Sequence, residues 1–432
     1  MIRINDIESL TTSRLRKIIN RHMRRRERLQ RALDMYLNGA PPIKTNVAKG
    51  RANNVVNTNL AKYIVDVATG YFVGTPPKYS FDKEAEEIGA AIQATYDAND
   101  ETNLNYTIAE NMSIYGVGYD IVRFDEEGRL RITALDPRDV FMIYDNTIDE
   151  RVLAAGRVYF ILNENDITDI YLDLYTADVM TTYRITGGAL EYVSETELYF
   201  GAVPITEYRN GAHCAGDFEA VKENIRQYNL ALSNMSDDLH STANAFLALT
   251  GLEDTDQEKI DRMNENRVVL LPYENASAYY VTKTLDATAS ENHKTTLRRD
   301  ILQVAGVPDL SDESFAGNAS GVALEYKLWG LDQLRTKKQQ GMDKGLFNRL
   351  KLVAAGLRVK GQNAPENISE FTTIAYTRNM PRDKTTDIDA AVKLNGIVSD
   401  NTIFKLLEPV TGVTVADETE KASAIFDVNE KS

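Results

Sequence analysis

The most regular hydrophobic pattern in the chain lies between residues 216 and 244. Apolar residues recur there at alternating spacings of three and four over three heptads, at Phe218, Val221, Ile225, Tyr228, Leu232, Met235 and Leu239. This spacing puts all seven side chains on one face of a helix that runs for about 39 Å from an N-cap at Asp217. Such a face is typical of a helix that packs along other helices, and also of an ordinary core helix.

Two more helices are predicted downstream, at 288–306 and at about 320–358. The second is the longest helical pattern in the chain, and it contains Gly330, Gly341 and Gly345. Each glycine costs about 1 kcal/mol relative to alanine inside a helix. Three of them in one helix predict either a bend or close packing against a neighbour.

Short segments of different character separate these helices. Residues 245–287 place a short helical pattern between two β-type runs, which predicts a small α/β insert. Residues 312–321, DESFAGNASG, are small and polar apart from Phe315. They predict a soft loop that carries a single aromatic ring.

The rest of the chain has the pattern of an α+β domain with mostly antiparallel strands. A helix is predicted at 57–68 and is expected to stop at Gly70. A further helix, and then strands separated by turns such as DEEG and DP, continue to about residue 209. After the longest helix come a strand at 370–379 and short helices at 384–395 and 400–407.

Charge is divided unevenly along the chain. The net charge is −15, yet residues 1–51 carry +9 and the remainder carries −24. A helix is predicted at 13–38, with Ser13 as its N-cap. Its apolar stripe is interrupted by four arginines, Arg24, Arg25, Arg26 and Arg28. This basic face is expected either to contact nucleic acid or an acidic partner, or to be a solvated face that pairs with the acidic body of a neighbouring subunit.

The motifs of the common enzyme classes are absent from the sequence. There is no phosphate-binding GxxxxGK[ST] and no GxGxxG that opens a helix after a strand. The single cysteine, Cys214, excludes an internal disulfide and fits a reducing cytoplasm, and the four histidines lack zinc-site spacing. No apolar run reaches the roughly 18 residues of a membrane span, and the N-terminus lacks a secretory signal pattern. We therefore expect a protein that is not an enzyme, with no metal, no cofactor and no membrane segment.

The ordered series of segments is more specific than any one of them. Four stretches carry a likeness to a known family: NNVVNTNLAKYIVDVATGYFVGTPPKYS, SIYGVGYDIVRFDEEGRLRITALDP, GDFEAVKENIRQYNLALSNMSDDL and LRRDILQVAGVPDLSDESFAGNASGVALEYKLWGLDQL. From about residue 50 to 410 the chain resembles the portal, or head-to-tail connector, proteins of tailed bacteriophages. The resemblance is to the branch found in long-tailed siphophages of Gram-positive hosts.

This resemblance implies an elongated α+β subunit of defined parts that assembles into a ring, generally of twelve copies. The implied parts are a basic N-terminal helical arm at 1–51, a wing at 52–215, a stem helix at 216–244, a clip at 245–287, a second stem helix at 288–309, a tunnel loop at 310–321, a kinked tunnel helix at 322–360, a strand returning to the wing at 361–382, and a short crown at 383–432. The residues expected to face the DNA channel are those of the tunnel loop, Asp312, Glu313, Ser314, Phe315, Ala316, Gly317, Asn318, Ala319 and Ser320.

The function implied is a channel at one vertex of the virion capsid, assembled in the host cytoplasm, for DNA packaging, retention and ejection. The implied partners are other copies of the chain, double-stranded DNA that passes without sequence readout, the terminase large subunit, a head–tail adaptor, and the major capsid and scaffolding proteins. An acidic body suits such a channel because tight phosphate contacts would retard moving DNA. The alternatives are a monomeric or dimeric nucleic-acid-processing protein with a basic arm, and a structural virion adaptor without a channel.

Overall fold

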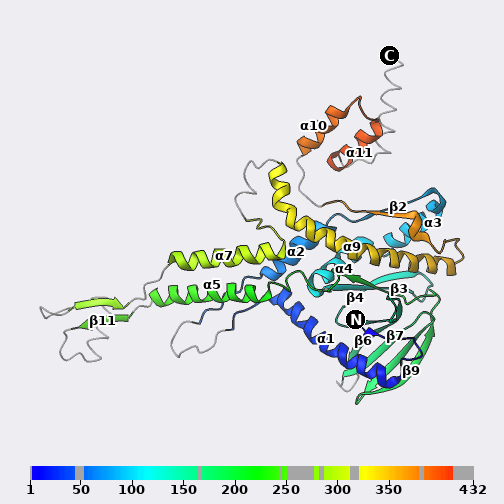
Figure 1. Cartoon of the computed structure of the whole chain (residues 1–432), viewed down its shortest axis with the longest axis horizontal. Coiled ribbons are helices and arrows are strands. Elements are labelled where there is room, and N and C mark those ends of the chain that lie inside the picture. Colours follow the sequence, from blue (N-terminus) through cyan, green and yellow to red (C-terminus); the bar gives the residue numbers. More distant parts are fainter. Residues whose placement is uncertain are drawn as a thin grey trace. The chain divides into compact units, whose positions relative to one another are not determined.

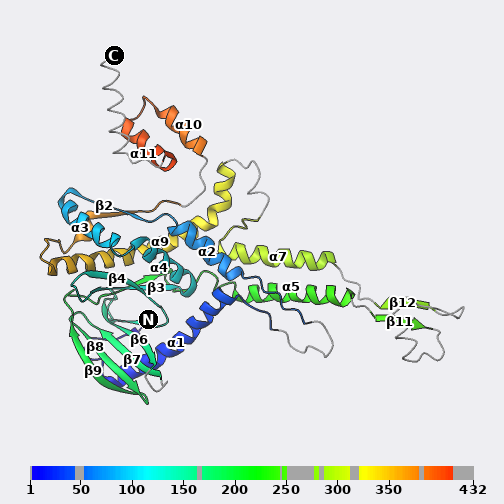
Figure 2. The ribbon, with the colours of Figure 1, turned by 180° about the vertical axis from the view of Figure 1, so that it is seen from behind.

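The computed structural model describes residues 2–43, 53–162, 168–243, 246–250, 277–281, 287–311, 321–378 and 384–411. The chain forms two compact units, Met1–Arg378 and Asn379–Ser432. Figure 1 labels the helices and strands, and Figure 2 shows them from behind. All of the labelled strands lie in the first unit, which mixes helices with largely antiparallel sheets. The predicted α+β class is therefore confirmed.

The elements follow one another in the order that the hydrophobic pattern indicates. The helices are α1 (Thr12–Asn38), α2 (Leu60–Val73), α3 (Glu86–Asp97), α4 (Glu101–Tyr115), α5 (Lys222–Ala243), α7 (Ala287–Ala305), α9 (Gly321–Val359), α10 (Lys384–Leu394) and α11 (Asp400–Thr411), with short 3-10 turns η1 (Lys83–Ala85) and η2 (Ile368–Phe371). The strands are β1 (Ile2–Arg3), β2 (Lys78–Phe81), β3 (Val117–Phe124), β4 (Leu130–Leu135), β5 (Val140–Tyr144), β6 (Val152–Leu162), β7 (Thr168–Tyr175), β8 (Val179–Thr186), β9 (Ala189–Glu197), β10 (Ile205–Arg209), β11 (Phe246–Thr250), β12 (Ser277–Val281) and β13 (Thr372–Ala375).

The largest sheet has six strands in the order β1-β5-β6-β7-β8-β9. Only the β1–β5 pair is parallel in this sheet. Helix α1 lies on it, and Leu15, Ile18 and Ile19 share a buried core with Phe141 and other side chains of the strands. The predicted boundary at residue 51 therefore does not separate two cores, because α1 and β1 pack on the strands of the expected wing.

The predicted N-cap of α1 is wrong by two residues. Thr11, with an extended backbone, accepts a hydrogen bond on its side chain from the backbone N–H of Arg14. Ser13 therefore lies inside the first turn. Thr11 and Ser13 are both good capping residues, and the sequence alone does not distinguish them.

A second core joins the three-stranded sheet β10-β3-β4 to four helices. Side chains of α3 and α4 and the C-terminal half of α9 form one buried cluster with residues of α2 and these strands. The predicted stripe of α9 supplies Met342, Leu346, Leu350, Val353 and Leu357, all of them buried. Strand β13, within the predicted 370–379 strand, returns to pair with β2.

Gly70 does not stop the second helix, contrary to the expectation from the sequence. Helix α2 continues through Gly70 and ends at Gly74. The residues that it gains, Tyr71, Phe72 and Val73, are all buried. Burying these three side chains outweighs the roughly 1 kcal/mol that a mid-helix glycine costs.

The glycines of α9 mark close contacts, and the helix also bends. A Cβ atom at Gly341 would lie 1.8 Å from the carbonyl oxygen of Arg209, and one at Gly345 would lie 2.2 Å from the ring of Tyr208. Strand β10 therefore rests directly on the backbone of α9. The first, yellow part of α9 runs in a different direction from its remainder (Figures 1 and 2). The helix therefore shows both features that its three glycines predict, a bend and close packing against a neighbour.

Helices α5 and α7 pack side by side (Figures 1 and 2). The range predicted for the second, 288–306, agrees with α7. Strands β11 and β12 form an antiparallel hairpin between the two helices in sequence. The helical pattern predicted inside the insert lies outside the described residues. Helix α5 begins at Lys222, so the predicted N-cap at Asp217 is wrong.

The second unit contains the two helices predicted near the C-terminus. Helix α10 and helix α11 contact each other. Their bounds agree with the predicted ranges 384–395 and 400–407 to within a few residues. Between them a single bridge joins Asn395 to Val398.

We expect Gly345→Ala to lower the free energy of unfolding by about 1–3 kcal/mol. The added methyl group would overlap the ring of Tyr208, which is buried and donates a hydrogen bond to Asp120. Gly70→Ala is the matched control, because no heavy atom lies within 4 Å of the position that its Cβ would take. That substitution should raise stability by about 0.5–1 kcal/mol. Urea denaturation followed by circular dichroism measures both, and an unchanged midpoint for Gly345→Ala would contradict the close packing.

Candidate functional site

The predicted apolar face of α5 is only partly covered within one chain. Phe218 and Val221, the first two members of the predicted face, precede α5 and are buried, and so are Ile225 and Tyr228 on the helix. Leu232 and Met235 are half-buried. Leu239 is 67% exposed, and Val304 on the neighbouring α7 is 62% exposed. The apolar surface of the two helices thus extends further than one chain covers.

A polar stripe on α5 binds an extended segment, residues 53–59. Asn229, Ser233 and Asp237 are spaced four residues apart along the helix. Their side-chain oxygens accept hydrogen bonds of 2.7–2.9 Å from the backbone N–H groups of every second residue of the segment, Thr58, Val56 and Asn54. Sequence reasoning missed this contact, although the N-x3-S-x3-D spacing was present in the predicted helix.

A buried ion pair joins α9 to the base of α5. The side chain of Lys338 is 1% exposed, and its Nζ lies 2.7 Å from Oδ2 of Asp217. The same Nζ donates a 2.7 Å hydrogen bond to Oγ of Ser113 on α4. Burial lowers the pKa of Lys338, and Asp217 opposes that shift. Asp217 therefore neutralises a buried lysine instead of capping the helix.

A second buried cation, Arg349, anchors the C-terminal half of α9. Its side chain is fully buried, with Nε 3.3 Å from Oδ2 of Asp120. The guanidinium lies between the rings of Tyr96 and Tyr208, each 5.7 Å from it. Burial raises the pKa of Asp120, and the charge of Arg349 opposes the shift. These contacts hold α9 against α3 and the three-stranded sheet.

The predicted channel loop, Asp312 to Ser320, lies outside the described residues. The segment before it is fixed by Arg298, whose guanidinium makes two hydrogen bonds to the Asp309 carboxylate. The hydroxyl of Tyr63 accepts the N–H of Leu310 and donates to the carbonyl of Pro308. These contacts hold the segment that follows α7 against α2.

Two aromatic side chains are exposed near the start of α9. Tyr326 is 77% exposed, and Trp329, the sole tryptophan of the chain, is 64% exposed. Neighbouring Gly330 approaches the carbonyl oxygen of Gly306 at the end of α7, since a Cβ there would lie 3.2 Å from it. A large aromatic pair on an exposed helix is typical of a protein–protein contact.

The four predicted arginines of α1 divide into two kinds. Arg25 donates to the carbonyl of Val140 and to the hydroxyl of Tyr119. Arg26 pairs with Asp139 and lies over the ring of Phe160. The other two, Arg24 and Arg28, are exposed and make no hydrogen bond or ion pair within the part of the chain that the structure describes.

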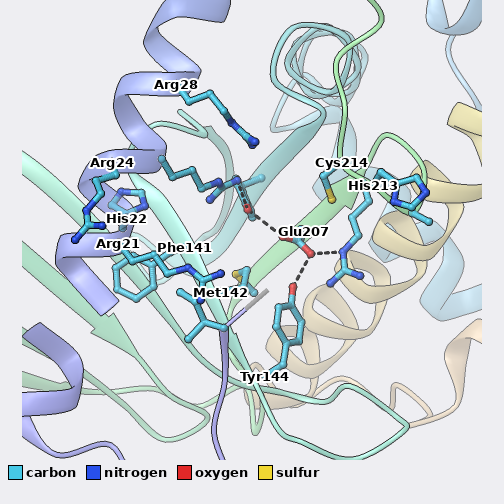
Figure 3. A pocket seen from close by; sticks show the side chains of 15 residues that line it. Arg21, His22, Arg24, Arg28, Phe141, Met142, Tyr144, Glu207, His213 and Cys214 are labelled. Atoms are coloured by element: carbon cyan, nitrogen blue, oxygen red, sulfur yellow. Dashed lines mark hydrogen bonds and ion pairs between the residues drawn. The ribbon is translucent and has the colours of Figure 1, made fainter. Parts of the chain in front are cut away.

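Arg24, Arg25 and Arg28 line a pocket of about 480 Å³, which we call the arginine pocket. It lies between α1, the β1–β5 edge of the large sheet, β10 and residues 212–214 (Figure 3). The complete lining is Ile2, Arg21, His22, Arg24, Arg25, Arg28, Tyr119, Phe141, Met142, Tyr144, Glu207, Arg209, Ala212, His213 and Cys214. Sequence reasoning did not find the contributions of β10, because they come together only in the folded chain.

The single carboxylate of this lining is already neutralised. Glu207 accepts hydrogen bonds from the hydroxyls of Tyr119 and Tyr144 and forms an ion pair with Arg209. Figure 3 shows Glu207 between the side chains of α1 and the segment that carries Cys214. Glu207 and Arg209 cancel, so the four arginines that α1 contributes to the lining give the pocket an excess of positive charge. It can therefore attract an anion.

His22 forms part of the wall of the pocket. Burial, together with the charges of Arg25 and Arg26, lowers the pKa of His22 to about 4. Its ring packs against Phe141, with the ring centroids 5.1 Å apart. The imidazole is therefore neutral near pH 7 and contributes no charge to the pocket.

Replacing Lys338 with methionine should cost about 3–5 kcal/mol of stability, because it leaves the Asp217 carboxylate buried without its cation. The double variant Lys338→Met/Asp217→Asn should recover part of that loss, since Asn210 can still donate to residue 217. Urea midpoints of the two variants measure the difference. Equal urea midpoints for the single and the double variant would show that the buried Asp217 carboxylate does not need the charge of Lys338.

The pKa of His22 predicts a loss of stability in acid. The unfolded chain binds a proton below the ordinary pKa of 6.5, whereas the folded chain does so only near 4. The stability that neutral His22 contributes is therefore fully present above pH 6.5 and is lost as the pH falls toward 4. The free energy of unfolding should fall by about 2 kcal/mol between pH 7 and pH 5. His22→Leu should flatten this part of the pH profile, and urea midpoints at the two pH values measure it. A variant profile as steep as that of the parent would contradict the assignment.

The described residues contain no group of three or more histidine, cysteine, aspartate or glutamate side chains that could hold a metal ion. No helix among the described residues is both long and apolar enough to cross a membrane.

Comparison with known proteins gives a family match over nearly the whole chain. Residues 15–428 match the family described as "Phage portal protein, SPP1 Gp6-like". No curated protein matches the chain.

Two solved particle structures contain similar chains. One, "Neck of empty GTA particle computed with C6 symmetry", is 13% identical with a TM-score of 0.47, over 83% of this chain and 91% of that chain. The other, "Virion of native gene transfer agent (GTA) particle", is 11% identical with a TM-score of 0.42, over 82% and 88%. On the match to residues 15–428, the chain belongs to the SPP1 Gp6-like family of phage portal proteins, which are structural components of the virion at the portal vertex.

Proposed function

We propose that this portal protein forms a closed ring of generally twelve copies, whose axial channel carries double-stranded DNA during packaging, retention and ejection. The observation that supports the ring most directly is the apolar surface left uncovered on α5, α7 and the start of α9. Leu239, Val304, Tyr326 and Trp329 are all more than 60% exposed in the single chain. Side chains of this kind are buried in stable assemblies, and a neighbouring copy supplies the missing cover.

The charge of the chain suits a channel that does not grip its cargo. Its net charge is −15. Arginine or lysine contacts to phosphates bind DNA tightly in a salt-dependent way, and an acidic wall avoids them. The energy for packaging would come from the terminase large subunit. We place its docking site at residues 245–287, and the head–tail adaptor and the major capsid and scaffolding proteins are the further partners that we propose.

The loop at residues 312–320 is proposed to project into the channel, with Phe315 repeated around the axis. The two segments that lead into and out of it support this role. Arg298 and Tyr63 fix residues 308–310, while Gly306 and Gly330 allow α7 and α9 to approach closely.

The test is to delete Ser314 to Asn318 and to examine both assembly and DNA content. Electron microscopy of the pure parent protein should show rings, because the uncovered apolar surface requires neighbours. The deletion should leave the rings intact, since no residue of the described stem is removed, and should abolish packaging or retention of DNA in heads.

Three outcomes would contradict this proposal at different points. Small particles in place of rings would favour a monomeric or dimeric nucleic-acid-processing protein. Rings without a channel wide enough for duplex DNA would favour a structural adaptor. Full heads that retain DNA after the deletion would leave the ring in place and remove the role of the loop.

A further inference from the structure

Two surfaces of the large sheet are unexplained by the single chain. The arginine pocket is rich in cations, and the opposite edge strand, β9, is rich in exposed anions. Neither has a partner of opposite charge adequate to neutralise it within the described residues. Both lie in the same compact unit, so that their arrangement on one sheet is defined.

The β9 edge is exposed along most of its length. Every residue from Glu191 to Glu197 is exposed, on both faces of the strand. Tyr192 is 64% exposed and Val193 is 49% exposed. Glu195 and Glu197 accept hydrogen bonds from the hydroxyls of Thr181 and Tyr199, and neither forms an ion pair within the described residues. An open edge strand that also carries apolar side chains is normally covered in the assembled protein.

The two surfaces lie at opposite ends of the sheet. Strand β9 is one edge, and the arginine pocket is built around the β1–β5 end. Strands β9 and β1 are five strand spacings apart, a distance of about 24 Å. A closed ring of identical subunits uses a head-to-tail contact, in which two different surfaces of one chain meet on neighbouring copies. Opposite edges of one sheet are well placed for such a contact.

The spacings of the charges also match. Arg24 and Arg28 are four residues apart on a helix, about 6 Å along its axis. Glu195 and Glu197 are two residues apart on a strand, about 7 Å. The chain already contains one contact in which helix residues four apart face extended residues two apart. The polar stripe of α5 binds every second residue of segment 53–59 in this way.

We propose that the acidic edge strand β9 of one subunit docks on the arginine pocket of the next, with Glu195 and Glu197 facing Arg24 and Arg28. This inference rests on the proposed ring and assigns one of its subunit contacts. The occupant is a protein segment, because half-buried Ile2 lines the pocket beside the arginines. Strand β9 carries the exposed Tyr192 and Val193 next to its carboxylates, so it offers apolar contacts as well as charge.

Charge reversal tests the contact. Arg24→Glu/Arg28→Glu should lower the fraction of protein in rings by at least about tenfold at fixed concentration, because it opposes like charges. Native mass spectrometry measures this fraction. Adding Glu195→Arg/Glu197→Arg to the same chain should restore rings. The control, Lys17→Glu/Arg31→Glu, changes the net charge equally at exposed positions of α1 outside the pocket and should assemble like the parent.

The lone cysteine allows a direct test of proximity. Cys214 lines the pocket and is the sole cysteine of the chain. Ser194→Cys places a second thiol on β9, and a short bismaleimide should then join neighbouring subunits into a ladder on a denaturing gel. Burial raises the pKa of the Cys214 thiol, so the reaction is run at alkaline pH. Removing the native thiol with Cys214→Ala should abolish the ladder.

Each result bears on a different claim. Absence of rings in the parent would overturn the ring itself. Rings in the parent that persist unchanged in Arg24→Glu/Arg28→Glu would overturn the contact but not the ring. Reversal variants that assemble normally but lose binding of a short duplex DNA would assign the pocket to phosphates instead. Loss of rings without rescue by the β9 reversal would exclude β9 as the partner strand.

Discussion

The ion pair between Lys338 and Asp217 joins segments that are far apart in sequence. Lysine is rarely buried, and a buried lysine requires a carboxylate and further acceptors. Here Asp217 and Ser113 meet that need. Because Ser113 belongs to α4 and Asp217 precedes α5, one ammonium group links α4 and the N-terminal end of α5 to α9. The glycines of α9 and the ion pair of Arg349 with Asp120 then determine how the remaining half of that helix lies on β10 and β3.

Much of this arrangement can be predicted from local sequence patterns, and the rest depends on contacts between residues far apart in the chain. The ranges of α7 and α9 could be predicted because each has a long run of helical periodicity. The close approach at Gly341 and Gly345 could also be anticipated, because glycine in a helix interior needs a reason. By contrast, the pattern around Asp217 is that of a capping residue, and nothing local shows that a lysine more than a hundred residues later is buried beside it.

The arginines of α1 illustrate the same limit at the candidate site. Their concentration in one helix is evident in the sequence, and so is the contrast with the acidic remainder. Which of them are satisfied within the chain depends on tertiary neighbours. Arg25 and Arg26 are held by β3, the residues before β5, and the start of β5. Glu207 and Arg209 enter the pocket from β10, whose position depends on the glycines of a helix near the other end of the chain.

The polar stripe of α5 has a consequence for how the chain can vary in length. Residues four apart on a helix advance about 40° around its axis at each step, so the bound segment must cross α5 obliquely. Because Asn229, Ser233 and Asp237 take alternate N–H groups, an added pair of residues in segment 53–59 would keep the same side of the backbone facing the helix. A single added residue would turn that side away for the residues beyond the insertion and leave their acceptors on α5 without donors. The contact of segment 53–59 with α5 therefore distinguishes even from odd changes in length.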